Sequence, residues 1–506
     1  MSQAEPPDGK LPQKNVNVRE AVLEGGAWIF LGRWIMRGLG IVSTIILARL
    51  LAPEDFGLMA LSVLLVGLAE VIGRYGPDAA VIRRQNLDRD YMDSAWTVAL
   101  ITGIVLGVCV FASAPLIAAY FNEPRAILLV QILSVRVFSI GLHNMGVVLF
   151  QKDLNFGKDI TVTMLEKLLP AIITLVSAYF IRNYWALVIG NIVGFAGAIA
   201  VSYAIHPYRP KICFKYLADV WSFSFWVLMQ RLAMFASMRL DSLFVPAVGN
   251  TSSLGHYHVG SELARMPVGE LFMPLDKVLY AAYARLIHEP GGLRNAYLTT
   301  VSTGFMICLP VSFGFALVAG DFVAIIYGEK WIPMIPVVEI IAFASGAMAL
   351  TGTVTPVLLA IGKSRLSASL IFLQALLLLS ALLLLQSRFD DITDIALVRL
   401  SAVMIVLPIA LICVQREISL PLIQVLKVCW RPVVAVCAMT LVLLHVTPQD
   451  MDMPAALRLA ARVAAGAAAY AGVLLLTWLL SGKPEGAERT VLNLLGQRPG
   501  KQSKTH

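Results

Sequence analysis

The chain carries little charge for its length. Only 14% of its 506 residues are Asp, Glu, Lys or Arg, against roughly 25% in a soluble domain, whereas 58% are hydrophobic. A soluble globule of this size cannot bury that much apolar surface. The composition therefore excludes an ordinary soluble enzyme and a disordered protein, and it predicts an all-α polytopic membrane protein.

Several other signals are lacking. The 40 Lys and Arg residues outnumber the 32 Asp and Glu residues, but they are spread over short connections, which excludes a nucleic-acid partner. The six cysteines show no disulfide or metal-ligand spacing, so neither a metal site nor a cofactor is expected. The first 20 residues are polar and indicate a cytoplasmic tail, because no apolar run precedes a cleavage site.

The sequence also lacks the features of an ATPase or an enzyme. The stretch before Gly362-Lys363-Ser364 has Val357 where a phosphate-binding loop would begin with glycine. The connections between apolar runs are too short to fold as a catalytic domain. We therefore expect a protein that is not an enzyme and does not carry its own ATPase.

Long apolar runs are what the chain has in abundance. A membrane helix needs about 20 such residues, and about fourteen runs satisfy this. They cover residues 25–50, 56–81, 94–120, 126–150, 160–181, 184–205, 217–247, 254–283, 296–319, 332–361, 364–386, 392–414, 425–447 and 455–480.

The connections predict the orientation of these helices. Connections after odd-numbered runs hold few basic residues, such as Arg125 and Arg182, whereas connections after even-numbered runs hold many, such as Arg83, Arg84 and Lys152. Because Lys and Arg are enriched in cytoplasmic loops, both termini are expected on the cytoplasmic side.

A weak internal repeat suggests two similar halves. Trp28 precedes Gly57 by 29 positions, as Trp226 precedes Gly255, and an arginine precedes each glycine by 24 positions. This pattern indicates a parallel repeat of the kind found in transporters. The expected organisation is an N-terminal tail (1–24), two six-helix bundles (25–216 and 217–418), an additional helix pair (419–481) and a C-terminal cytoplasmic tail (482–506).

Short sequence words resemble a known family. The segment at 48–57 reads Ala-Arg-Leu-Leu-Ala-Pro-Glu-Asp-Phe-Gly. It resembles the corresponding segment of the polysaccharide flippases of the MOP exporter superfamily, which move oligosaccharide repeat units of O-antigen and exopolysaccharide across the membrane. Similar words follow in the family's order at 151–156, 185–188, Asp241, 254–257 and Pro267. The region after residue 290 matches mainly by helix count. The chain departs from the family at 280–283, where Tyr-Ala-Ala-Tyr replaces a Phe-Pro type of pair, and at 262–265, which is more highly charged.

The resemblance implies a transporter that works by alternating access. Its substrate would be an undecaprenyl-pyrophosphate-linked oligosaccharide, moved from the cytoplasmic to the periplasmic leaflet of a bacterial inner membrane. The product would serve exopolysaccharide, capsule or lipopolysaccharide biosynthesis. Membrane lipids, a polysaccharide polymerase and glycosyltransferases are the partners that this function implies.

Ionisable residues inside membrane helices are costly and mark candidate sites. Guanidinium groups bind phosphate oxygens in pairs of hydrogen bonds, so arginines that face a water-filled vestibule could hold a pyrophosphate. The alternative is that they extend to the lipid head groups. The candidates are Arg33, Arg37, Arg74, Arg136, Arg231 and Arg265.

Acidic residues inside the spans suggest ion coupling. A buried carboxylate can titrate near neutral pH and so respond to a proton or sodium gradient. The alternative is an ion pair with an arginine, and Glu70 could pair with Arg74 four residues later. The candidates for coupling are Glu70, Asp241, Glu262 and Glu270.

Other functions stay open. A cation-coupled small-molecule exporter of the same superfamily would have an apolar, acidic cavity, which the arginines disfavour. A membrane-embedded polysaccharide polymerase would need a sizeable loop that the chain does not have. A structural scaffold would not need arginines on several membrane helices.

Overall fold

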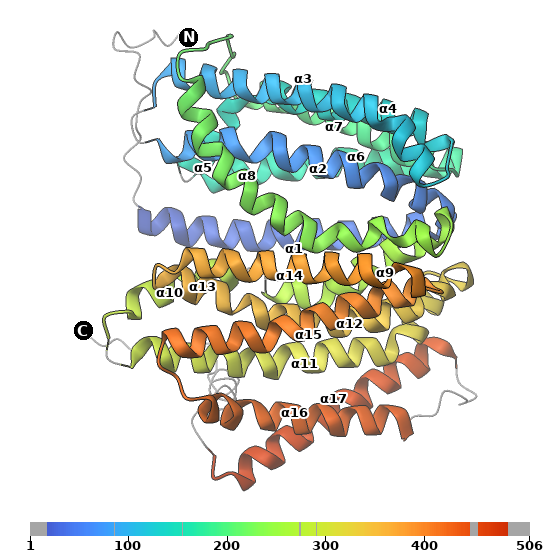
Figure 1. Cartoon of the computed structure of the whole chain (residues 1–506), viewed down its shortest axis with the longest axis vertical. Coiled ribbons are helices and arrows are strands. Elements are labelled where there is room, and N and C mark those ends of the chain that lie inside the picture. Colours follow the sequence, from blue (N-terminus) through green and yellow to red (C-terminus); the bar gives the residue numbers. More distant parts are fainter. Residues whose placement is uncertain are drawn as a thin grey trace. The chain divides into compact units, whose positions relative to one another are not determined.

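The computed structural model describes residues 18–84, 87–153, 155–272, 275–289, 291–445 and 454–483. Within its helices, the side chains of residues 18–31, 33, 34, 74–76, 79, 156, 222–230 and 272–278 are left undescribed. The described residues form helices joined by short connections and contain no β-strand (Figure 1). The predicted all-α class is confirmed.

The described parts of the fourteen predicted spans are mainly helical. Among the described residues, eleven helical segments are long and apolar enough to cross a membrane, whereas the total of fourteen crossings and the side of the termini stay predictions. The α-helices are α1 (Val18–Leu50), α2 (Pro53–Arg83), α3 (Arg89–Tyr120), α4 (Arg125–Phe138), α5 (Val148–Lys152), α6 (Phe156–Ile181), α7 (Trp185–Ile205), α8 (Leu217–Arg239), α9 (Thr251–Phe272), α10 (Leu275–Leu286), α11 (Gly292–Ile326), α12 (Ile335–Gly352), α13 (Val354–Ala360), α14 (Ser364–Leu385), α15 (Ile392–Glu417), α16 (Leu422–His445) and α17 (Ala455–Leu480).

Some predicted spans are broken in the structure. The run 126–150 divides because α4 ends at Phe138 and two 3₁₀ turns, η1 (Ser139–Leu142) and η2 (Met145–Val147), precede α5. The 3₁₀ turns η3 (Leu240–Leu243) and η4 (Val245–Ala247) similarly follow α8. Such turns satisfy backbone groups while they change the direction of the chain.

Internal contacts divide the chain into two compact units, Met1–His258 (unit 1) and Val259–His506 (unit 2). This boundary lies beyond the one expected at residue 217, because α8 packs against α2 and α3. The additional helix pair, α16 and α17, packs against α11 within unit 2.

Helix α2 lies at the centre of unit 1. It packs against α3, α4 and α8, while α6 pairs with α7 and α1. Buried side chains at these contacts include Leu58 of α2 and Leu129, Leu133 and Val137 of α4. An apolar face of each of these helices is therefore buried against its neighbours, which favours close helix packing.

Unit 2 is built around α11, which contacts α12, α16 and α17. Ser312 of α11 donates a hydrogen bond to the carbonyl oxygen of Ala342 in α12 at 2.6 Å. A Cβ atom on Gly346 would lie 2.5 Å from the Ser312 hydroxyl oxygen. Small residues thus let these two helices approach closely, as is common between membrane helices.

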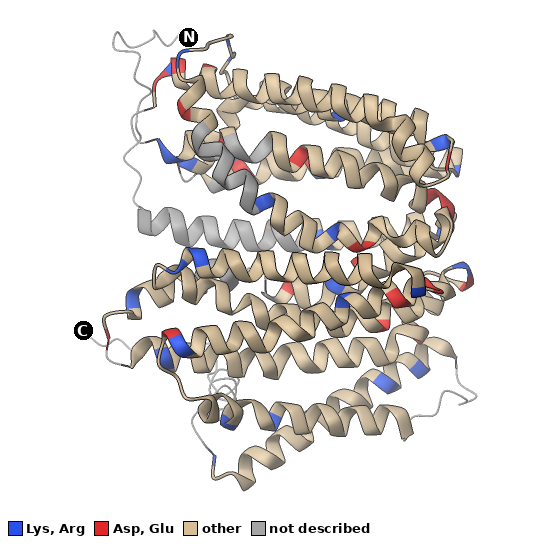
Figure 2. Ribbon diagram, viewed as in Figure 1, with Lys and Arg blue, Asp and Glu red and all other residues tan. Residues whose placement is uncertain are grey.

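Charged residues gather mainly near the ends of the helices (Figure 2). The stretches between these ends are largely uncharged, and many apolar side chains on them are exposed, such as Leu116, Phe180 and Leu384. Exposed apolar side chains of this number are stable in lipid rather than in water. The protein is therefore a multi-pass membrane protein, and the charges inside its helices deserve individual explanation.

Candidate functional site

Arg136 of α4 joins three helices of unit 1. Its Nε donates to Oε1 of Glu70 on α2 at 2.6 Å, and its Nη1 donates to Oδ1 of Asn191 on α7. Its guanidinium carbon lies 5.4 Å from the centre of the Phe195 ring. The Arg136 side chain nevertheless remains 26% exposed and that of Glu70 23% exposed. The structure thus brings two predicted site residues together as an accessible ion pair.

The other predicted arginines have different surroundings. Arg37 is half-buried on α1, Arg231 is exposed on α8, and Arg265 is half-buried in the unit 2 part of α9. The side chains of Arg33 and Arg74 lie outside the described residues. The expected pairing of Glu70 with Arg74 is thus untested, and the partner that the structure gives Glu70 is Arg136 on another helix.

The predicted coupling carboxylates also differ from one another. Asp241 is fully buried in η3, where its Oδ2 accepts a hydrogen bond from the Tyr257 hydroxyl at 2.7 Å and its Oδ1 accepts one from the Ser242 backbone at 3.1 Å. Glu262 is exposed and Glu270 is half-buried, both in unit 2. Only a buried carboxylate with hydrogen-bond donors fits the expected environment closely, and among these three that residue is Asp241.

A second polar pair includes a residue of the segment between α4 and α5, where the predicted span 126–150 is broken. Nε2 of His143 is 2.6 Å from Oε1 of Glu166 on α6, and each side chain is 20% exposed. The sequence analysis did not select this pair. The available signal was the interruption of an apolar run by Gly141, His143 and Gly146, because irregular backbone inside a membrane span is tolerated mainly where it lines protein or a cavity.

Four of the five residues in the word at 53–57 have separate structural roles. Pro53 is the first residue of α2, a position that needs no N–H donor. Asp55 accepts the backbone N–H of Ala52 at 2.9 Å and that of Tyr184, before α7, also at 2.9 Å. Glu54 pairs with Arg125 at the start of α4, and Gly57 contacts α9. The word therefore connects four helices at the predicted external end.

Glu123 completes this polar connection. Its carboxylate accepts hydrogen bonds from Nε of Arg125 at 2.7 Å, from Nη2 of Arg125 at 2.9 Å and from the Thr251 hydroxyl at 2.9 Å. The hydrogen bonds from Arg125 are the main reason that the pKa of Glu123 lies below its ordinary value. Glu123 is therefore ionised at neutral pH, although it is largely buried.

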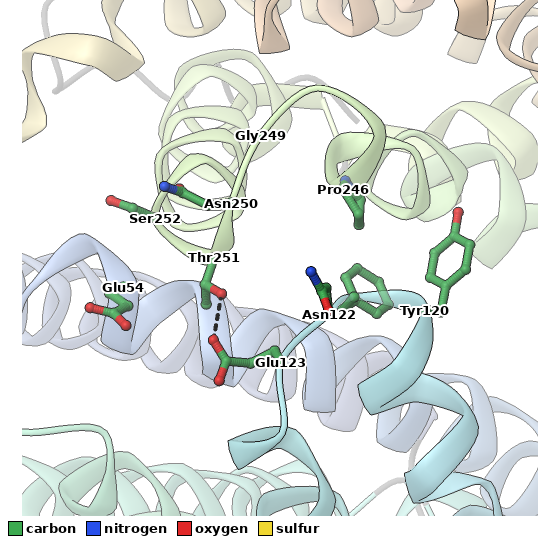
Figure 3. Close-up of a pocket in the computed structure, with 10 residues that line it drawn as sticks. Glu54, Tyr120, Asn122, Glu123, Pro246, Gly249, Asn250, Thr251 and Ser252 are labelled. Atoms are coloured by element: carbon green, nitrogen blue, oxygen red, sulfur yellow. Dashed lines mark hydrogen bonds between the residues drawn. The ribbon is translucent and has the colours of Figure 1, made fainter.

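A pocket of about 410 Å³ opens beside Glu123. Figure 3 shows the Thr251 hydroxyl directed at Glu123, with Asn122 and Tyr120 on the side of the α3–α4 connection. The pocket lies entirely within unit 1. Its lining residues are Glu54, Tyr120, Phe121, Asn122, Glu123, Pro246, Gly249, Asn250, Thr251 and Ser252.

Unit 2 contains a buried ion cluster that the sequence analysis also missed. The Asp321 carboxylate of α11 forms salt bridges with two arginines of α17. Its oxygens lie 2.6 Å from Nη1 of Arg462 and 2.8 Å from Nη2 of Arg458. Arg462 also donates to the Leu317 carbonyl oxygen at 3.0 Å. The signal was present, because Arg458 and Arg462 are four residues apart in one apolar run and so share a helix face.

The chain's relatives are consistent with this architecture. The family described as "Polysaccharide biosynthesis protein" matches residues 46–336, more than half of the chain. The chain belongs to this family. The matched region contains every word on which the sequence resemblance rested, from residue 48 to Pro267, so the predicted resemblance is confirmed.

Individual family relatives include proteins of surface polysaccharide synthesis. The lipopolysaccharide biosynthesis protein WzxC of Escherichia coli is 27% identical over 64% of this chain and 67% of its own length. The succinoglycan biosynthesis transport protein ExoT of Rhizobium meliloti is 23% identical over 68% and 70%. The teichuronic acid biosynthesis protein TuaB of Bacillus subtilis is 21% identical over 90% and 95%.

Two solved structures share the fold of this chain. The lipid II flippase MurJ, in an inward closed conformation, matches with a TM-score of 0.72 and 14% identity, over 89% of this chain and 99% of MurJ. An inward-facing multidrug resistance MATE family transporter of the MOP superfamily matches with a TM-score of 0.60 and 16% identity, over 75% and 94%. These likenesses concern the fold alone.

Proposed function

We propose that the protein flips undecaprenyl-pyrophosphate-linked oligosaccharide repeat units across the bacterial inner membrane by alternating access. The observation that carries this proposal is the family match over residues 46–336. The named relatives serve lipopolysaccharide, succinoglycan and teichuronic acid synthesis, and a lipid II flippase shares the fold. Lipid II, like the proposed substrate, is a saccharide carried on a lipid.

The Arg136 contact supplies a suitable group for the charged end of the substrate. The contacts to Glu70 and Asn191 use its Nε and Nη1, and part of the side chain remains exposed. A pyrophosphate cannot enter hydrocarbon without compensating charge, and a guanidinium provides it without losing its own proton. Phosphate oxygens would compete with Glu70 for Arg136, so substrate binding would displace the Glu70 carboxylate from this contact.

This exchange gives Glu70 a role in coupling. Because the partner of Glu70 would differ between the empty and the occupied site, the exchange would favour one of the two transport states when substrate is bound. Arg33, Arg37, Arg74, Arg231 and Arg265 remain candidates for further phosphate contacts. Asp241, Glu262 and Glu270 remain candidates for coupling.

The products would be used by other membrane enzymes. A glycosyltransferase must build the oligosaccharide on the cytoplasmic face, and a polymerase must join repeat units on the other face. The protein itself would make and break no covalent bond.

Deletion of the gene in its host tests the function. The proposal predicts loss of surface polysaccharide and accumulation of lipid-linked repeat units in the inner leaflet. The intact gene should restore the polysaccharide and remove the accumulation. Normal polysaccharide without accumulation would contradict it.

The second candidate is a cation-coupled small-molecule exporter, favoured by the MATE-like fold. This function predicts that deletion increases sensitivity to cationic drugs and leaves the lipid-linked pool unchanged. The same deletion strain therefore separates the two functions.

A further inference from the structure

The pocket at the predicted external end has a lining of mixed chemistry. Asn122 and Asn250 contribute amides, Thr251 and Ser252 contribute hydroxyls, and Tyr120 contributes an aromatic ring with a hydroxyl. These groups donate and accept hydrogen bonds from several directions. Figure 3 shows Tyr120 and Asn122 on the α3–α4 connection, with Asn250, Thr251 and Ser252 opposite them at the start of α9.

The size and shape of the pocket suit a small ligand. A volume of about 410 Å³ lies in the range of small-molecule sites, roughly 300–1,000 Å³. The pocket is formed by short loops and helix ends rather than by one long loop. A mono- or disaccharide presented by the end of a longer glycan could enter it.

The charges in the pocket select against anions. Among the described lining residues are two carboxylates, Glu54 and Glu123, and no Lys, Arg or His. Arg125 is bound to both carboxylates and does not line the pocket. The two carboxylates and Arg125 together carry a net charge of −1 (−2 + 1), and like charges repel, so a uronic acid or a free phosphate would be disfavoured there.

The same carboxylates favour hydroxyl donors. Glu123 is fixed by Arg125 and Thr251 and is ionised at neutral pH. A hydrogen bond from a hydroxyl to an ionised carboxylate is about twice as strong as one between neutral groups. Sugar hydroxyls are donors of this kind, and their number matches the several polar groups in the lining.

Tyr120 supplies the apolar surface that a sugar also needs. Its side chain is exposed, its ring is packed edge-on against Phe121 at 5.0 Å between ring centres, and its hydroxyl donates to the Leu243 carbonyl oxygen at 2.9 Å. These contacts hold the ring in place. The negative face of such a ring attracts the C–H groups of a sugar.

The geometry points to a saccharide-binding subsite for neutral or N-acetylated sugars in this external pocket. This inference rests on the proposed function for its biological meaning, since it places the site on the side where the glycan is released. Both walls, the α3–α4 connection and the start of α9, are joined by the Thr251–Glu123 hydrogen bond. A sugar bound to both walls would therefore stabilise this arrangement of unit 1.

Saturation-transfer NMR on the full chain in lipid nanodiscs tests the subsite. The probes are lactose, chitobiose and, as the anionic control, glucuronic acid, each at millimolar concentration. Lactose or chitobiose should receive saturation from the protein and glucuronic acid should not. Tyr120→Leu should weaken that binding by about tenfold, which is the loss of roughly 1.4 kcal/mol.

Tyr179→Leu is the matched control. Tyr179 is also an exposed tyrosine packed edge-on against a phenylalanine, Phe180, but on α6 and outside the pocket. Its variant should bind the sugars as the unmodified chain does. Ser252→Tyr, which fills the opening, should abolish binding even if Tyr120→Leu fails to fold.

Several results would overturn the subsite. They are absence of transfer to both neutral sugars, equal transfer in all variants, preference for glucuronic acid, or binding that requires calcium and disappears with EDTA. Because the probe is a free sugar, the outcome is independent of export. Normal export without sugar binding would contradict only this inference, whereas sugar binding in a chain that cannot restore polysaccharide would contradict only the proposed function.

Discussion

Gly57 and Gly255 meet in a reciprocal close contact between the first turns of α2 and α9. A Cβ atom on Gly57 would lie 1.8 Å from the carbonyl oxygen of Thr251, and one on Gly255 would lie 1.9 Å from that of Pro53. Each glycine is the fifth residue of its helix. The repeat inferred from the spacing of Trp28 and Trp226 stays a prediction, and the same two glycines end both of its matching spacings.

Substitution of Gly255 by Ala should destabilise this contact. The methyl group would overlap backbone atoms, which cannot move aside as a flexible side chain can, and overpacking of this kind costs about 1–3 kcal/mol. Thermal unfolding in detergent should show a lower Tm for Gly255→Ala. Gly40→Ala is the control, because nothing lies within 4 Å of a Cβ there, and its Tm should be unchanged or higher. Equal Tm values for the two variants would show that the close contact is absent.

The Glu123 carboxylate should make stability depend on pH. Its pKa lies below the ordinary value because of Arg125, so its stabilising effect is complete above the unfolded pKa, about 4.3. The effect is lost as the pH falls through the lower folded pKa. The Tm advantage of the unmodified chain over Glu123→Gln should therefore be largest near neutral pH and shrink below about pH 4.3.

The exposed Glu329 provides the control for this titration. Glu329→Gln should follow the unmodified chain across the same pH range. A difference between Glu123→Gln and the unmodified chain that stays constant down to acidic pH would contradict the ion pair with Arg125.

The Asp321 cluster should fasten α17 to α11. Asp321→Ala would leave Arg462 buried without its carboxylate, and breaking a buried pair in this way costs about 3–5 kcal/mol. Arg458→Gln should cost much less, because the Arg458 side chain is 27% exposed against 5% for Arg462. Unfolding free energies of the two variants check this order, and an equal cost would mean that burial does not govern the cluster.

The arrangement of helices was largely predictable because it depends on long apolar runs. The described parts of these runs are mainly helical, including the runs that end in α16 and α17. The breaks at Ser139–Leu142 and Leu240–Leu243 were not predictable, since hydropathy does not report how a backbone satisfies its hydrogen bonds. The packing of α8 against α2 and α3 was not predictable either, because packing partners depend on side-chain shape.

The candidate site was predictable in its residue types but not in its pairings. Sequence spacing relates residues on one helix, so it suggested Glu70 with Arg74. The contact of Glu70 with Arg136 joins residues 66 positions apart, and no periodicity reveals that. The external pocket was missed for the same reason, because Glu54 at the start of α2, Glu123 in the α3–α4 connection and Thr251 at the start of α9 lie far apart in the sequence.

Translocation by the purified protein tests the central claim most directly. Proteoliposomes would carry a lipid-linked oligosaccharide in the inner leaflet, and its appearance in the outer leaflet would be timed. We expect a transfer rate well above that in protein-free liposomes. Arg136→Ala should lower this rate at least about tenfold, equivalent to roughly 1.4 kcal/mol. Arg388→Ala, which alters an exposed arginine, should leave the rate unchanged. Transfer no faster than in protein-free liposomes, or an unchanged rate in Arg136→Ala, would contradict the central claim.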